Sequence, residues 1–213
     1  MHELQPYHLD VLKEVSNIGV AHAATALSNL IDNRIEMSVP NVRLTMIRDL
    51  PDQIGGAETK VAAIFLRMIG DASGSLYFIT RTKDAETLVR AFTRDEHFQL
   101  DKPPYDELGL SAFQEIGNIL AGSFLTSLAN FTRLHLQPTV PGVAVDMAGA
   151  ILTDGLISLL QVGDHAIVID TEMKQSRDES RRLTGQFLFL PDPDSFSVLF
   201  HALGVEMDGK RGD

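Results

Sequence analysis

The chain has 213 residues, of which 44% are hydrophobic and 22% are charged, a composition typical of a folded protein with a substantial core. Its formal net charge of −11 argues against nucleic-acid binding, because an acidic surface repels phosphate. The absence of cysteine excludes disulfides, thiolate metal ligands and cysteine nucleophiles. The chain does not open with a basic segment followed by an apolar one, and no uncharged apolar run approaches the roughly 20 residues that cross a bilayer. We therefore expect a cytoplasmic protein without membrane insertion.

The first predicted element is a long amphipathic helix that starts near Asp10. At about 100° per residue, one face of this helix gathers apolar and small residues and should pack on a sheet: Leu12, Val15, Gly19, Ala23, Ala26 and Leu30. The opposite face carries a few polar residues among small ones: Asp10, Glu14, Asn17, Ala21, Ala24 and Ser28. An ordinary solvated face would be filled with Lys, Glu and Arg. A face of small residues leaves room for another macromolecule to dock closely.

Strand-like segments follow at residues 35–46, 61–69 and 75–80. A helix then closes the first half of the chain, with Asp84 as its expected N-cap. The polar stretch 93–107, which contains Pro103 and Pro104, is the expected junction between the halves.

The second half repeats this order. A long helix from Ser111 precedes strand-like segments at 134–145, 165–173 and 185–190, and a last helix has Asp194 as its expected N-cap. The buried stripe of the long helix should contain Phe113, Ile116, Leu120, Phe124 and Phe131. Its outward face carries Ser111, Glu115, Asn118, Gly122 and Ala129, and also Leu125, a bulky residue that we expect to intrude there.

The two halves are related by an internal duplication. Residues 10–42 align without a gap with residues 111–143, and nine of the 33 aligned positions are identical. The identities include polar residues, Glu14 with Glu115 and Asn17 with Asn118, so shared amphipathic patterning alone does not explain them. We predict an α/β (α+β) fold with pseudo-twofold internal symmetry and two long exposed helices packed on a β-sheet. It should form one domain over residues 1–213, with repeats at about 1–100 and 101–213.

The spacing of these residues resembles the signature of the CheC/CheX/FliY phosphatases of bacterial and archaeal chemotaxis. That signature is Asp or Ser, three residues, Glu, two residues, Asn, then 22 residues and Pro. The chain meets it twice, with Asp10, Glu14, Asn17 and Pro40, and with Ser111, Glu115, Asn118 and Pro141. The resemblance covers essentially the whole chain. It is to the CheC branch, since CheX proteins are shorter with one such site and FliY proteins carry an additional C-terminal domain.

The resemblance implies that the chain hydrolyses the aspartyl phosphate of the phosphorylated receiver CheY. An acyl phosphate already has a good leaving group, so the enzyme must mainly position a water in line with phosphorus. A side-chain amide can do this without acting as a nucleophile, and we assign the role to Asn17 and Asn118. By resemblance, Glu14 and Glu115 pair with a receiver lysine. The family's Mg²⁺ is held by the receiver, so we expect no cofactor of the chain's own.

Two other functions remain open from the sequence. Glu14 and Glu115 could form an acid pair of the glycosidase type, but that hypothesis leaves the repeated Asn unexplained. The chain could instead be a regulatory binding module, because CheC proteins also associate with the receptor deamidase CheD. The candidate surface is residues 146–160, an insertion-like apolar segment with Asp146 and Asp154. A packed connecting helix would explain the same segment.

Overall fold

The computed structural model describes residues 6–156, 165–175 and 178–204. Its elements in chain order are α1 (Pro6–Ile31), β1 (Ile35–Ser38), β2 (Val42–Met46), η1 (Ile47–Asp49), α2 (Leu50–Gln53), β3 (Lys60–Gly70), β4 (Gly74–Arg81), α3 (Thr82–Thr93), α4 (Glu107–Thr132), β5 (Leu136–Pro138), β6 (Gly142–Met147), α5 (Ala148–Leu156), β7 (His165–Gln175), β8 (Asp178–Pro191) and α6 (Pro193–Ala202). Within these ranges, none of the helices combines the length and apolar character that crossing a bilayer requires.

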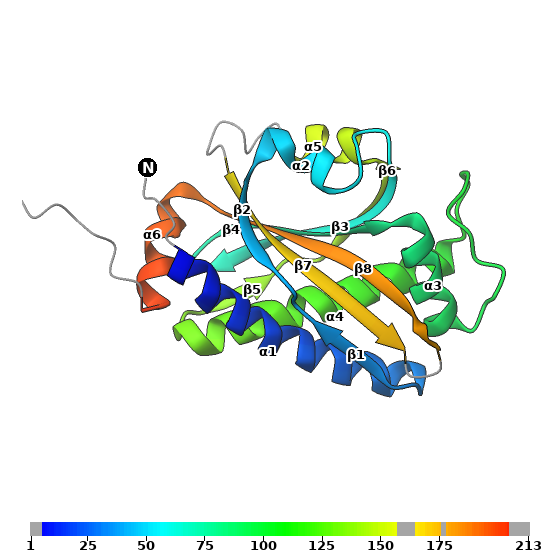
Figure 1. Ribbon diagram of the computed structural model, residues 1–213, viewed down its shortest axis with the longest axis horizontal. Helices are drawn as coiled ribbons and strands as arrows, with labels where there is room; N and C mark the ends of the chain where they lie inside the picture. The colour runs from blue at the N-terminus through cyan, green and yellow to red at the C-terminus, as the bar shows by residue number, and fades with distance from the viewer. Residues whose placement is uncertain (1–5, 157–164, 176–177, 205–213) are drawn as a thin grey trace, which may run out of the picture.

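The strands form one eight-stranded antiparallel sheet with the order β1-β7-β8-β4-β3-β5 (Figure 1). The short strand pairs that follow the long helices cross over to the other half of the chain. Strands β1 and β2 both pair with β7, and β5 and β6 both pair with β3. Each half therefore completes the sheet of the other, and the two repeats share one sheet.

The main core lies between this sheet and α1, α3 and α4. Within it, Phe124 of α4 packs on Phe187 and Phe189 of β8, with ring centroids 5.9 and 5.7 Å apart. A smaller second core covers the other face of the sheet beneath α2 and α5. The prediction of two long helices packed on a sheet in an α/β fold is confirmed.

The long helices bury more than the one face that the helical wheel assigned to each. Helices α1 and α4 also pack against each other, so closely that a Cβ added at Gly19 would lie 3.0 Å from the Cα of Phe124. This contact buries the matched pair Ala24 and Leu125, so the prediction that Leu125 intrudes on the outward face was wrong. Leu30 and Phe131, assigned to the buried stripes, are half exposed at the C-terminal ends of their helices.

Both N-cap predictions were wrong. Asp84 is buried inside the first turn of α3, where it accepts hydrogen bonds from the Arg81 guanidinium at 3.0 and 3.1 Å. The N-cap of α6 is Asp192 rather than Asp194, and its carboxylate pairs with Arg67 of β3 (Nη2–Oδ2 2.5 Å) instead of capping the helix. The sequence shows an acidic residue near the start of each helix, but it does not show that an arginine pairs with the carboxylate and so prevents it from capping the helix.

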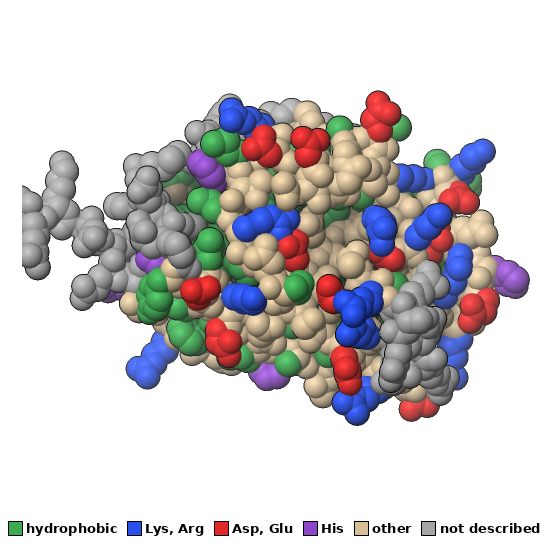
Figure 2. Space-filling model, viewed as in Figure 1, with side chains coloured by type: hydrophobic (Ala, Val, Ile, Leu, Met, Phe, Trp, Pro, Cys, Tyr) green, Lys and Arg blue, Asp and Glu red, His purple; other side chains and the backbone are tan. Residues whose placement is uncertain are grey.

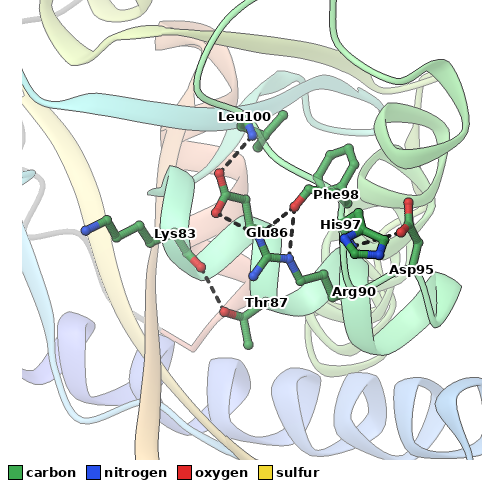
Figure 3. A network of polar contacts seen from close by, with 8 residues as sticks. All are labelled: Lys83, Glu86, Thr87, Arg90, Asp95, His97, Phe98 and Leu100. Atoms are coloured by element: carbon green, nitrogen blue, oxygen red, sulfur yellow. Dashed lines mark hydrogen bonds and ion pairs between the residues drawn. The ribbon is translucent and has the colours of Figure 1, made fainter.

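A connector, residues 94–106, joins α3 to α4, and hydrogen bonds hold its first half, up to Leu100, against α3 (Figure 3). Glu86 accepts from the Leu100 N–H at 2.8 Å, and the Arg90 guanidinium donates to the Phe98 carbonyl at 2.7 and 2.9 Å. Phe98 in turn packs so tightly on Gly109 that an added Cβ would lie 1.9 Å from its ring. The connector thereby sets where α4 begins on the sheet.

Helix α5 is not an insertion peculiar to the second half. It follows β6 as η1 and α2 follow β2, and α2 and α5 contact each other over the second core (Figure 1). Ala148, Ile151 and Leu152 are buried there, so packing explains the apolar character of the segment. The insertion interpretation missed this core because α2 is short and polar in sequence.

Candidate functional site

The two Glu/Asn pairs lie on the neighbouring helices α1 and α4, which pack side by side. A spacing of three residues places the members of each pair on one helix face, because residues at i and i+3 are surface neighbours. Glu14, Glu115 and Asn118 are exposed, whereas Asn17 is half-buried. The structure thus presents two copies of a carboxylate beside an amide at the outer side of the same helix pair.

The residues one turn before each pair are exposed as well. Asp10 points to solvent, and the hydroxyl of Ser111 donates to the Glu107 carbonyl of its own helix at 2.8 Å. Of the small residues predicted to surround the pairs, Ala21 is exposed and a Cβ added at Gly122 would meet nothing within 4 Å. These positions leave the helix surface beside each pair open to a large partner.

Ser28 and Ala129 are not part of that open surface. The Ser28 hydroxyl accepts from the Ile35 N–H at 2.8 Å and so ties the end of α1 to β1. Ala129 is half-buried and packs against the main core. The small-residue face is therefore shorter than the sequence pattern suggested and is centred on the Glu/Asn pairs.

The two signature prolines lie at matched places but in different surroundings. Pro40 follows β1 and is exposed, whereas Pro141 follows β5 and is buried. In the first copy the Val39 N–H donates to Oδ1 of Asn17 at 3.0 Å. In the second copy Nε2 of Gln114 donates to the Pro141 carbonyl at 2.6 Å. Each loop is held by a side chain of the helix that carries its Glu/Asn pair.

Sequence reasoning missed Gln114, which lies one turn before Asn118. The only signal for it was a mismatch within the repeat, since the first copy has Lys13 at the matched position. The different settings of Val39 and Val140 had no signal at all, because both copies have valine followed by proline.

A cleft of about 480 Å³ lies beside α2, over the C-terminal end of β4 and the middle of β7 and β8, and Pro40 is among the residues that line it. Two of its polar groups bind each other, since Gln186 donates to Asp170 at 2.8 Å, and Arg43 of the neighbouring β2 pairs with the same carboxylate. On the face turned to the viewer in Figure 2, acidic and basic side chains are mixed, so the described residues of this face carry no extended patch of one charge. The cleft contains neither Glu/Asn pair, and an exposed helix surface suits a protein substrate better than a small molecule.

Comparison with known proteins relates the chain to chemotaxis phosphatases. The profile of the CheC-like family matches residues 8–43 and 108–145, the two segments that hold the repeated helices and their loops. The CheY-P phosphatase CheC of Bacillus subtilis (strain 168) is 44% identical over 199 residues, covering 93% of this chain and 95% of that protein.

Solved structures share the fold. FliY of Thermotoga maritima has a TM-score of 0.74 at 18% identity and covers 94% of this chain and 98% of its own. The CheX of the CheX-CheY-BeF₃-Mg²⁺ complex from Borrelia burgdorferi has a TM-score of 0.51 at 14% identity, covering 82% and 95%. On the strength of the Bacillus relative and the matched profile, this chain belongs to the CheC-like family.

Proposed function

We propose that the chain is a phosphatase that hydrolyses the aspartyl phosphate of phosphorylated CheY. The observation that carries the proposal is the pair of outward-facing Glu/Asn sites on α1 and α4, in a chain 44% identical to a CheY-P phosphatase over 93% of its length. The CheX of similar fold was solved as a complex with CheY, which supports a receiver as the docking partner. We place this activity in the cytoplasm.

The reaction needs little from the phosphatase beyond geometry and charge. A water attacks phosphorus, the bond between phosphorus and the receiver aspartate breaks, and the carboxylate leaves while the water proton passes to the released phosphate. Asn17 or Asn118 would orient that water through its side-chain amide, which offers both an acceptor and a donor. Glu14 and Glu115 would bind a receiver lysine and so set the docked register. We propose that Mg²⁺ belongs to the receiver, where it would neutralise phosphoryl charge.

The direct test is the decay of a phosphorylated CheY receiver with and without the chain, after removal of the phosphodonor. We expect the chain at substoichiometric concentration to accelerate loss of the phosphoryl group, because one docking site turns over many receivers. Decay at the same rate in its presence, for receivers that demonstrably bind the chain, would contradict the proposed function.

We also propose a regulatory association with CheD, as the resemblance implies. Asp146 is exposed at the end of β6 beside the half-exposed Met147, which makes it available to a partner. Asp154, the other predicted contact, lies in α5, but its side chain is outside the described part of the chain, as are residues 157–160. The Asp146 carboxylate also accepts from the Met147 N–H at 2.7 Å.

Replacing Asp146 by Ala should weaken CheD binding at least about fivefold, the usual cost of losing a contributing interface side chain. Receiver dephosphorylation should stay unchanged, because Asp146 lies outside the Glu/Asn helices. Isothermal titration of CheD into the variant measures the first effect, with Glu96→Ala as a control that removes an exposed acid from the connector. Equal CheD affinity for the wild type and both variants would remove Asp146 from this role.

A further inference from the structure

The two copies of the signature hold the same loop sequence in opposite ways. Val39 and Val140 occupy matched positions, yet Val39 is 2% exposed and Val140 is 85% exposed. The prolines that follow show the reverse, with Pro40 exposed and Pro141 buried. In the first copy the valine turns inward, and in the second copy it protrudes.

The helix side chains that hold the loops account for this difference. In the first copy the inward valine brings its N–H to Oδ1 of Asn17. In the second copy Gln114 holds the Pro141 carbonyl at 2.6 Å, which fixes the proline inward and the valine outward. The first copy has Lys13 where the second has Gln114, and in the described structure Lys13 makes no hydrogen bond to its loop.

The consequence falls on the two amides that are proposed to orient water. Oδ1 of Asn17 accepts a hydrogen bond from the backbone of its own loop. If Asn17 turned away to bind a water, the Val39 N–H would lose its partner next to a buried side chain. Asn118 is exposed, and its side-chain amide has no hydrogen-bond partner among the residues that the structure describes. Gln114 is one helical turn before Asn118 on the same side of α4, so the loop is bonded to the helix face that carries this amide.

We propose that Gln114 is a positioning residue of the second site. By holding the Pro141 carbonyl it keeps the Val140 N–H away from Asn118, so this amide stays free to orient the attacking water. Val140 then projects as an apolar contact for the docked receiver. The second site carries most of the hydrolysis, and Asn17 serves chiefly to hold the loop after β1. This inference rests on the proposed phosphatase function and assigns unequal catalytic activity to its two sites.

The activity arm uses chains in which Asn17→Ala leaves only the second site. Adding Gln114→Met removes the donor at similar side-chain length, and we expect kcat for receiver dephosphorylation to fall roughly tenfold, because the loop can then capture Asn118. Lys13→Met in the same background is the matched control and should leave kcat within about twofold. Val140→Ser should instead raise KM with kcat unchanged, since it removes a docking contact but no positioning bond.

The second arm measures backbone amide hydrogen exchange and thermal unfolding without any receiver. The Val39 N–H should be protected in the wild type and lose that protection with Asn17→Ala, together with a lower unfolding midpoint. The Val140 N–H should exchange freely in the wild type and gain protection with Gln114→Met. Asn118→Ala should leave both amides and the midpoint unchanged.

The outcomes separate this inference from the proposed function. A wild-type chain that does not accelerate receiver decay overturns the phosphatase function, and the exchange arm still decides whether the loops differ as described. A chain that is active but keeps its kcat after Gln114→Met overturns the role of Gln114. An Asn118→Ala chain that retains more than half of the wild-type rate overturns the unequal division of work.

Discussion

A chain that carries both Asn17→Ala and Asn118→Ala is expected to lose about 100-fold or more of its acceleration of receiver dephosphorylation. Removing one preorganised polar group that acts on the transition state commonly costs 10²–10³ in rate. The double substitution removes the water-orienting amide from both sites at once, so neither site can compensate. Docking should persist, because Glu14 and Glu115 remain in place on the outer side of the helices.

The repeat itself supplies the matched control for this experiment. Asn29 and Asn130 are also identical between the halves, lie on the same two helices, and are exposed near the helix ends. Asn29→Ala with Asn130→Ala removes the same chemical groups from the same elements, yet should leave the rate within about twofold. Circular dichroism and thermal unfolding of both double variants guard against loss of the fold. A folded Asn17→Ala, Asn118→Ala chain with wild-type activity would reject the amide as the water-orienting group.

The sequence predicted the long helices and the central strands well because their signals are local. Hydrophobic periodicity and β-branched runs depend on neighbouring residues, and the repeat doubled each signal. The burial of Leu125 could not be predicted from these local signals. Its position on the wheel was that of an outward residue, and only the close crossing of α1 and α4 at Gly19 places it in the core.

The crossed pairing of the short strands was equally beyond local reasoning. Strands β1 and β2 pair with β7, which is more than a hundred residues away. From the repeat alone one would expect each half to form a sheet of its own. The prediction of the candidate residues needed only the motif spacing. The difference between Val39 and Val140 needed the three-dimensional partners Asn17 and Gln114, because the local sequences are alike.

The shared sheet makes contacts between the halves the most sensitive places in the fold, and Gly70 is the clearest of these. It ends β3 at a φ of 126° and pairs with Leu136 of β5. A Cβ added there would lie 2.0 Å from the His135 carbonyl oxygen, a backbone atom that no side-chain rotation can move. Beside it, the Asp71 N–H donates to that same carbonyl at 2.9 Å, and the Asp71 carboxylate accepts from the His135 N–H at 2.8 Å.

Gly70→Ala is therefore expected to lower the free energy of unfolding by about 4 kcal/mol, combining the strain of a positive φ with a backbone clash. Gly56→Ala is the matched control, because Gly56 has a φ of 108° but its added Cβ would meet only the Thr59 hydroxyl at 3.8 Å. That variant should lose about 1–2 kcal/mol from strain alone. Urea unfolding of both variants measures the difference, with midpoints of thermal unfolding lower by roughly 2–4 °C for each kcal/mol. Equal losses would mean that β5 shifts to relieve the clash, and the contact between the halves would then be looser than its geometry implies. A larger loss for Gly70→Ala would mean that the backbone at His135 and Leu136 does not yield to the added methyl group, so the contact between the two repeats is rigid.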